Sequence, residues 1–370
     1  MKVALAHDYL RDFGGAERVL LALSELYPEA PIYTAFYKKE SIAHDRFKDK
    51  KIIASWAQRI PFFVNKLHSP LRFLAPKIWS SFDFSGFDVV ISSASWYITK
   101  GINVPKNTLH ISYIHTPPRY LYGYPVSVDW QKYWIVRQYA KVVNHYLRMY
   151  DFESAQKPDV LIANSKNVQK RITKFYRRKS QIIYPPVDLP KVELARKGDY
   201  YLVISRIVGG KGLSLAIKAA NRMKVPLKVV GTSVWGKEEE KLKSMAGSTV
   251  KFMGYVEDRE LSRLYAGAKA FLVLAENEDF GITPVEAMGA GTPVIAYKGG
   301  GYLETVKEGK TGVFFNKLSV DSLVDAMEKL DEMEIFEKNC REQAEKFSKE
   351  RFMGRITELV DREIKGKKNA

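Results

Sequence analysis

Short apolar runs alternate with segments of helical periodicity along most of the chain. In the first half, the runs at 2–6, 89–91, 111–114 and 160–163 predict β-strands, and the amphipathic segment 16–26 predicts a helix. Nearly continuous apolar strands are typical of parallel sheets, because helices cover both faces of such sheets. The first half is therefore expected to form a parallel sheet with helices on both sides.

The second half repeats this alternation more regularly. Its predicted elements, alternately strand and helix until two final strands, lie at 201–204, 213–223, 227–230, 238–245, 251–253, 261–266, 270–274, 284–289, 294–296 and 312–315. Strand–helix alternation predicts a second doubly wound α/β domain.

The two series meet where Pro185, Pro186 and Pro190 interrupt the chain. We expect one Rossmann-like domain at 1–187 and another at 188–348. Periodicity does not show which domain the last predicted helix packs on, so the terminal segment 349–370 could complete the first domain. Doubly wound domains bind ligands at the carboxyl ends of their strands, which predicts a site in the cleft between two such domains.

Charge is unevenly distributed along the chain. The net charge is +17; residues 1–190 carry 28 Lys and Arg against 15 Asp and Glu, and residues 191–370 carry 31 against 27. Residues 51–150 hold 12 basic and 3 acidic residues together with five of the six tryptophans. This front half predicts an anionic partner, either nucleic acid, an anionic membrane surface or a phosphorylated acceptor. Alternatively, the basic residues only keep the protein soluble. The aromatic residues could likewise form a buried core instead of a membrane-docking surface.

The composition excludes several classes of protein. At 46% hydrophobic and 27% charged residues, the chain resembles a folded globular protein. No apolar run approaches the ~18 residues of a membrane span, and the first residues lead directly into a strand rather than a signal peptide. One cysteine excludes an internal disulfide framework and a cysteine-rich metal site. We expect a cytoplasmic protein, with peripheral docking on the inner face of a membrane as an option.

The segment around two glutamates carries the most specific chemistry. Glu278 is expected in the loop after a strand, followed by Gly281 and a helix that begins at Thr283 and Pro284. Free backbone N–H groups at such a helix start can hold phosphate. Glu286 has a structural alternative, since Thr283-x-x-Glu286 with proline at the first helical position is a capping box. Glu278 has no such alternative.

Glu278 and Glu286, around Phe280-Gly281, resemble the signature of the retaining glycosyltransferases of family 4, which have the GT-B fold. Further stretches match this family in order, at 14–17, 163–165 with Arg171, 184–188, 205–212, 299–304 and 309–312. His7 to Leu10 and Tyr113 to Leu121 resemble a subgroup, the WbaZ-type mannosyltransferases of polysaccharide assembly.

Arg206 and Lys211 lie in a glycine-rich turn between a predicted strand and helix, and resemble the pair that grips the donor diphosphate in the family. Cations and N–H groups at this place can stabilise the charge that develops on a departing diphosphate. Alternatively, Arg206 and Lys211 are solvated surface charges of a loop and bind no ligand. The chain has no Asp-x-Asp pair, so the common metal clamp is missing. The resemblance likewise implies a metal-independent enzyme without a cofactor.

The remaining candidates also come from the resemblance and from their predicted strand ends. His115, in a loop that Pro117 and Pro118 stiffen, is implied to contact the donor sugar near the anomeric carbon. The glycine pair at 14–15 could offer N–H groups to phosphate, although such a pair is more often a plain turn. The expected catalytic residues are Glu278, His115, Arg206 and Lys211; the donor-binding residues are Gly14, Gly15, Arg206, Lys211, Gly231, Met253, Gly254, Glu278, Phe280, Gly281, Ile282, Thr283 and Glu286; the acceptor-binding residues are Asp8 and Arg119.

These features together favour a retaining hexosyltransferase. The resemblance implies a nucleoside diphosphate sugar donor, GDP- or UDP-linked with mannose from GDP-mannose favoured, and a saccharide or lipid-linked acceptor. Two alternatives stay open. A nucleotide-sugar epimerase of the same fold would share donor binding but need no acceptor. A nucleic-acid-binding protein is suggested only by the charge of +17, and no recognisable nucleic-acid module supports it.

Overall fold

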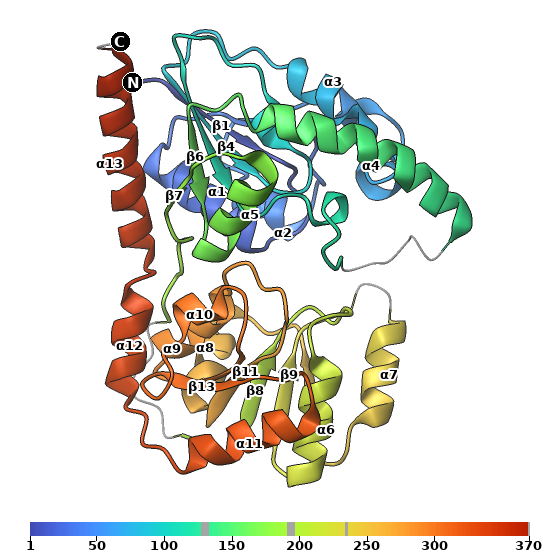
Figure 1. Cartoon of the computed structure of the whole chain (residues 1–370), viewed down its shortest axis with the longest axis vertical. Helices are drawn as coiled ribbons and strands as arrows, with labels where there is room; N and C mark the ends of the chain where they lie inside the picture. Colours follow the sequence, from blue (N-terminus) through green and yellow to red (C-terminus); the bar gives the residue numbers. More distant parts are fainter. Residues whose placement is uncertain (127–132, 191–196, 234–235, 369–370) are drawn as a thin grey trace. The chain divides into compact units, whose positions relative to one another are not determined.

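The computed structural model describes residues 1–126, 133–190, 197–233 and 236–368, and it divides into two compact units (Figure 1). The first unit contains 1–124, 133–186 and the returning segment 349–368. The second contains residues 125–126 and the described residues of 187–348. Each unit is built on a single sheet whose described strands are all parallel.

The first sheet has seven strands, and its longest ones are buried along their whole length. In spatial order the strands are β3 (Ile52–Ala54), β2 (Ile32–Thr34), β1 (Val3–His7), β4 (Val89–Ala94), β5 (Leu109–Ile114), β6 (Val160–Ala163) and β7 (Gln181–Ile182). The chain order reverses direction between β1 and β4, so this is the topological switch point of the first sheet.

The helices of the first unit cover both faces of its sheet. They are α1 (Gly15–Leu26), α2 (Ile42–Arg46), α3 (Ala75–Ser80), α4 (Trp134–Ser154), α5 (Lys166–Tyr176) and α13 (Lys349–Lys368). On one face, Phe352, Ile356 and Leu359 of α13 pack in one cluster with α1 and with the sheet residues Ile91 and Ile111. Their spacing places them on one side of the helix, which is why this polar terminal segment docks through a narrow apolar stripe.

The opposite face of the first sheet is covered by the aromatic-rich segment before β4. Phe63 and Trp79 are fully buried there, and the indole of Trp79 donates to the carbonyl of Tyr97. In contrast, Phe62 and Phe73 are exposed. Phe63 and Trp79 are therefore core residues and do not fit the expected membrane docking, which stays a prediction for the exposed Phe62 and Phe73.

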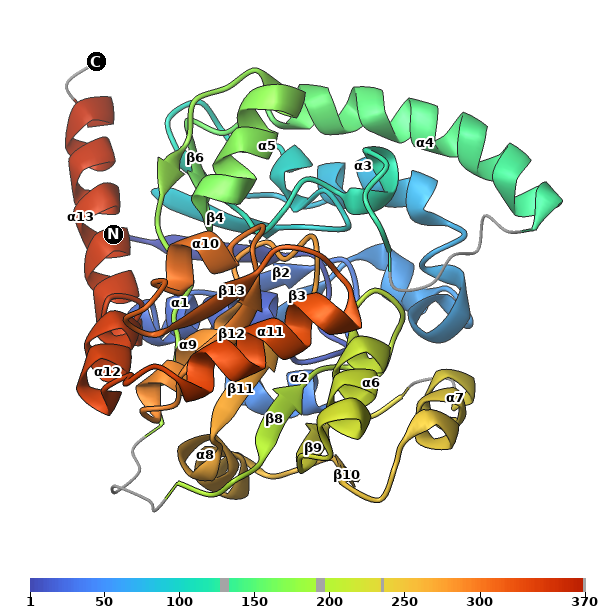
Figure 2. The same cartoon turned by 60° about the horizontal axis from the view of Figure 1, so that its bottom comes forward.

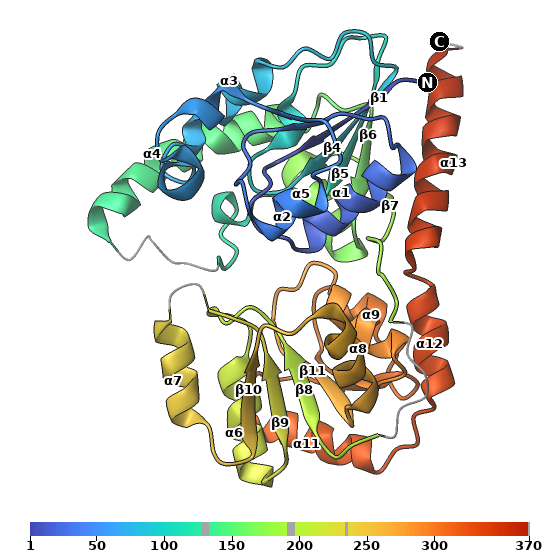
Figure 3. The same cartoon turned by 180° about the vertical axis from the view of Figure 1, so that it is seen from behind.

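The second sheet has six strands in the order β10 (Val250–Gly254), β9 (Leu227–Val230), β8 (Tyr201–Ile204), β11 (Ala270–Val273), β12 (Val294–Tyr297) and β13 (Gly312–Phe315). Its switch point lies between β8 and β11. The two views in Figures 2 and 3 show helices on both sides of this sheet. The helices of the unit are α6 (Leu213–Met223), α7 (Lys237–Met245), α8 (Asp258–Gly267), α9 (Ile282–Gly289), α10 (Tyr302–Thr305), α11 (Val320–Asp331) and α12 (Glu337–Glu345).

Candidate functional site

Two of the predicted charged residues meet at the switch point of the second sheet. The loops that follow β8 and β11 leave neighbouring parallel strands at their carboxyl ends, and they carry Lys211 and Glu278 respectively. Lys211 Nζ donates to Glu278 Oε2 over 3.0 Å. The two side chains are 31% and 23% exposed, so a ligand can reach the pair. The fold thus brings together residues that are 67 positions apart.

Arg206 lies in the loop after β8 and is exposed. This loop is held by Gly231, whose φ is +140° and whose Cβ, if present, would lie 1.9 Å from the Ser205 carbonyl oxygen. The N–H of Gly231 in turn donates to the carbonyl of Gly254, over 2.9 Å. Met253, next to it, is partly buried in β10. Gly231 and Gly254, both expected donor-binding residues, therefore support the backbone that carries Arg206.

The Glu278 loop is fixed by its own backbone and by one buried ring. The N–H of Gly301 donates to the Glu278 carbonyl over 3.0 Å. Phe280 is buried, with its ring centroid 5.3 Å from that of Phe347. Phe280 was predicted to bind donor, and its buried ring leaves only its backbone for that purpose. Rigid support of this kind holds Glu278 in place at the strand end.

The start of α9 differs from the capping-box interpretation of the sequence. The helix begins at Ile282 with Gly281 as its N-cap, and no side chain makes a capping hydrogen bond there. Thr283 and Pro284 are the second and third helical residues, so the expectation of a Thr283–Glu286 capping box is wrong. Glu286 instead lies in the interior, where Tyr265 Oη donates to its Oε2 over 2.8 Å.

In the first unit, His115 ends a hydrogen-bonded series at the switch point between β1 and β4. Its Nε2 lies 2.7 Å from Ser93 Oγ, which is 3.0 Å from Nδ1 of His7. The Nε2 of His7 lies 3.4 Å from Glu17 Oε1. Burial, reinforced by His7, lowers the pKa of His115 to about 3, so its imidazole is neutral at ordinary pH. The sequence did not indicate that Ser93 links the two histidines, because no local pattern marks this residue.

Gly14 and Gly15 form the turn into α1, as expected from the sequence. The N–H of Gly14, however, donates to Glu17 Oε2 over 2.8 Å. This amide is thus already used by a carboxylate within the first turn of the helix, where an anion is favoured. A phosphate would have to compete with Glu17 for it.

The two predicted acceptor-binding residues lie in different environments. Asp8 is 4% exposed, and its carboxylate accepts hydrogen bonds from the N–H groups of Ser95 (2.9 Å) and Tyr97 (3.0 Å) and from Thr99. Its carboxylate is therefore occupied in holding the 95–99 loop, which does not fit a direct acceptor contact. Arg119 begins a one-turn 3₁₀ helix and is partly buried.

Two further residues of the family motif support the loop of His115. Asn164 Nδ2 donates to the His115 carbonyl over 2.9 Å, and Arg171 Nη1 donates to Thr116 Oγ1 over 2.9 Å. Both residues are almost completely buried. They position the loop rather than face solvent.

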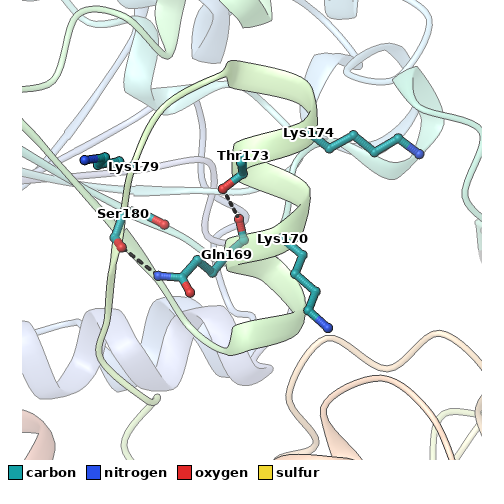
Figure 4. Close-up of a pocket in the computed structure, with 6 residues that line it drawn as sticks. All are labelled: Gln169, Lys170, Thr173, Lys174, Lys179 and Ser180. Carbon is teal, nitrogen blue, oxygen red and sulfur yellow. Dashed lines mark hydrogen bonds between the residues drawn. The ribbon is translucent and has the colours of Figure 1, made fainter.

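A surface hollow on α5 contains none of the predicted residues. Gln169 Nε2 donates to the Ser180 carbonyl over 2.7 Å beside it, and the lysine side chains point in different directions instead of converging (Figure 4). Its lining residues are Gln169, Lys170, Thr173, Lys174, Lys179 and Ser180. Within the described ranges, we find no group of three or more His, Cys, Asp or Glu side chains arranged for a metal ion. No helix among the described residues is long and apolar enough to cross a bilayer.

Family comparison assigns both halves of the chain. Residues 13–191 match the model of Glycosyltransferase Family 4, and residues 187–347 match that of Glycosyl transferases group 1. The chain therefore belongs to the glycosyltransferases of family 4 with the GT-B fold, as the sequence motifs predicted.

Individual relatives agree with this assignment. Sulfoquinovosyl transferase SQD2 of Arabidopsis thaliana is 31% identical over 152 residues, which is 39% of this chain and 29% of that protein. Alpha-1,3/1,6-mannosyltransferase ALG2 of Rhizomucor pusillus is 46% identical over 68 residues, 18% of this chain and 15% of that protein. The matches thus span less than a third of either relative.

Solved structures show the same fold over the whole chain. Sucrose-phosphate synthase of Thermosynechococcus elongatus has a TM-score of 0.74 at 17% identity, covering 99% of this chain and 100% of that one. HepE of Anabaena, solved in complex with UDP, has a TM-score of 0.71 at 18% identity, covering 98% and 100%.

Proposed function

We propose that this protein transfers a hexose from a nucleoside diphosphate sugar to a saccharide or lipid-linked acceptor, with retention of the anomeric configuration. The second unit would bind the donor and the first unit the acceptor. The observation that carries the proposal is the Lys211–Glu278 pair, an accessible cation and carboxylate at the carboxyl ends of β8 and β11. Doubly wound sheets bind their ligands at this position.

The proposed chemistry divides the charges of this site between two parts of the donor. Arg206 and Lys211 would stabilise the negative charge that grows on the departing diphosphate. Glu278 would hold hydroxyls of the sugar and stabilise positive charge at the anomeric carbon. The sugar–phosphate C–O bond breaks, the acceptor oxygen attacks from the same face, and the departing phosphate takes the acceptor proton.

Three other groups complete the proposed donor site. Glu286, held by Tyr265, would bind the ribose of the nucleotide. Neutral His115 would offer an imidazole to the sugar without adding a positive charge near the anomeric carbon. The backbone at 280–283 would contact the donor phosphates from the start of α9. No cofactor or metal enters this scheme, because Arg206 and Lys211 supply the positive charge.

For the donor, we favour mannose carried by GDP. The resemblance of His7–Leu10 and of Tyr113–Leu121 to mannosyltransferases supports this choice, as does the similarity to a relative named as a mannosyltransferase. A UDP-linked donor is the alternative, supported by the solved HepE complex with UDP.

The decisive experiment is a donor screen with purified protein. Calorimetry with GDP and UDP identifies the base, and slow hydrolysis of GDP-mannose and UDP-glucose identifies the sugar. We expect one pair to bind and to be hydrolysed, with undiminished rate in EDTA. The anomeric configuration of the released sugar, followed by NMR before mutarotation, tests retention. Conversion of a donor into another sugar isomer would instead indicate an epimerase, and absence of nucleotide binding would refute the proposal.

A further inference from the structure

Helix α4 exposes an apolar stripe to solvent. Ile135, Val142, Tyr146 and Met149 are 73%, 73%, 49% and 55% exposed. At about 100° per residue, these four positions lie within about 60° of one another around the helix. Large apolar residues scattered singly on a surface are ordinary, but a continuous stripe of them marks an interaction site. Glu153, exposed at the same angle, ends the stripe.

The opposite side of α4 is firmly packed, so the stripe cannot simply rotate inwards. Leu147 is fully buried, and Asn144 Oδ1 accepts a hydrogen bond from Arg72 Nη2 over 3.0 Å. Near the end of the helix, Asp151 is completely buried and paired with Lys100. In Figures 1 and 2 the amino-terminal part of α4 runs out beyond the sheet of the first unit.

Basic side chains lie on the exposed surface of α4 between the stripe and the buried side. Arg137, Lys141 and Arg148 are exposed and cluster about 120° around the helix from the stripe. No aspartate or glutamate occurs in residues 133–150. Long basic side chains can lay their apolar stems along a surface and place their charges at its polar boundary. We define the α4 face as these three residues together with Ile135, Val142, Tyr146 and Met149.

We propose that the α4 face docks on the surface of an anionic lipid bilayer, with the helix lying in the plane of the interface. A helix with an exposed apolar stripe and Lys and Arg on its exposed polar side has the pattern of a helix that binds there. A second copy of this chain fits less well, because a symmetric contact would bring the same basic residues of both copies together. Nucleic acid would use the charges but not the aliphatic side chains of Ile135 and Val142.

Vesicle flotation with the full chain tests this docking without requiring any enzymatic activity, so its outcome is independent of the proposed reaction. We expect recovery with vesicles of phosphatidylcholine and phosphatidylglycerol at low salt, and little recovery with phosphatidylcholine alone. Recovery should fall as salt is added, because surface charge is screened. Equal recovery with both vesicles, or none with either, would overturn the proposal.

Two paired variants separate the charged and apolar contributions. Arg137→Gln with Lys141→Gln should lower partitioning about 25-fold, or about fivefold for each charge, the equivalent of ~1 kcal/mol per basic residue at an anionic surface. Val142→Ser with Met149→Ser leaves the charge unchanged and should lower partitioning at least ~10-fold through lost apolar burial.

Matched controls lie on exposed positions of the second unit. Lys218→Gln with Lys241→Gln removes the same charge, and Leu303→Ser with Phe336→Ser removes comparable exposed apolar surface. Both controls should retain most of the vesicle binding. Equal losses in controls and test variants would overturn the assignment to α4. So would a dimer in light scattering that the Val142→Ser, Met149→Ser variant dissociates, since the face would then join two copies.

Discussion

Replacing Glu278 by glutamine should have opposite effects on nucleotide binding and on turnover. Glu278 accepts a hydrogen bond from Lys211 over 3.0 Å. A nucleoside diphosphate must therefore compete with this carboxylate for the ammonium group. Glutamine keeps the size of the side chain but removes its charge, so Lys211 becomes available to the diphosphate.

The expected magnitudes follow from the exposure of the pair. Side chains that are 31% and 23% exposed form a partly screened ion pair, for which about 0.2–1 kcal/mol is typical. Glu278→Gln should therefore tighten binding of GDP or UDP by up to about fivefold and change the free energy of unfolding by less than ~1 kcal/mol. The carboxylate should matter far more as the glycosidic bond breaks, so kcat should fall at least ~10²-fold.

Calorimetry gives the nucleotide affinity, and initial rates at saturating donor give kcat. Glu276→Gln is the matched control, because Glu276 lies in the same loop and is exposed. It should leave both quantities close to those of the unchanged protein. Weaker nucleotide binding combined with near-normal kcat in Glu278→Gln would refute both the competition for Lys211 and the catalytic role of Glu278.

Three further predictions concern other residues. Arg206→Ala should weaken nucleoside diphosphate binding by about 1.5–3 kcal/mol, as expected for a charge-assisted contact, and unchanged affinity in calorimetry would place the phosphates elsewhere. Glu286→Gln should raise the donor KM with little effect on kcat or melting temperature, because glutamine can still accept the Tyr265 hydrogen bond; an equal loss in kcat would contradict a ribose-binding role. Burial lowers the pKa values of His110 and His115 from 6.5 to about 3. Between pH 3 and pH 6.5 the unfolded chain therefore binds more protons than the folded chain, so the free energy of unfolding should fall as pH drops below about 6.5. Urea unfolding at pH 7 and pH 5 measures this loss, which His110→Asn should reduce; the same slope in that variant would count against the reasoning.

The regular alternation of the second unit was predictable because most of its strands are buried and, apart from Lys228 and Lys251, read as short apolar runs. The sequence-based strands at 201–204 and 227–230 coincide with β8 and β9. The short strands β2, β3 and β7 carry no such signal and were not predicted. Helix α4 was missed for another reason: its buried side carries the polar residues Asn144, Asp151 and Ser154, whereas its large apolar residues are mostly exposed, so its hydrophobic pattern does not mark a buried face.

The sequence indicates which residues belong to the candidate site but not which residues they contact. The family resemblance selected Lys211 and Glu278, yet nothing local indicates that the two are in contact, because adjacent strands bring them together. Asp8 shows the converse: its position at a strand end suggested ligand binding, while the amides that occupy its carboxylate come from 95–99, almost ninety positions later. Local pattern also misplaced the start of α9, since the N-cap at Gly281 depends on a backbone conformation rather than on a capping side chain.

The return of the chain to the first unit through α13 has a consequence for biosynthesis. A ribosome synthesises residues 1–186 long before it reaches Phe352 and Ile356, which complete the core against α1. The intervening residues 187–348 take about 8–30 s to synthesise at about 5–20 residues per second. During that interval, one face of the nascent first sheet lacks α13, so the amino-terminal unit can complete its core only after the second unit has been synthesised. The second unit does not depend on α13 and can finish folding while the first unit is still incomplete.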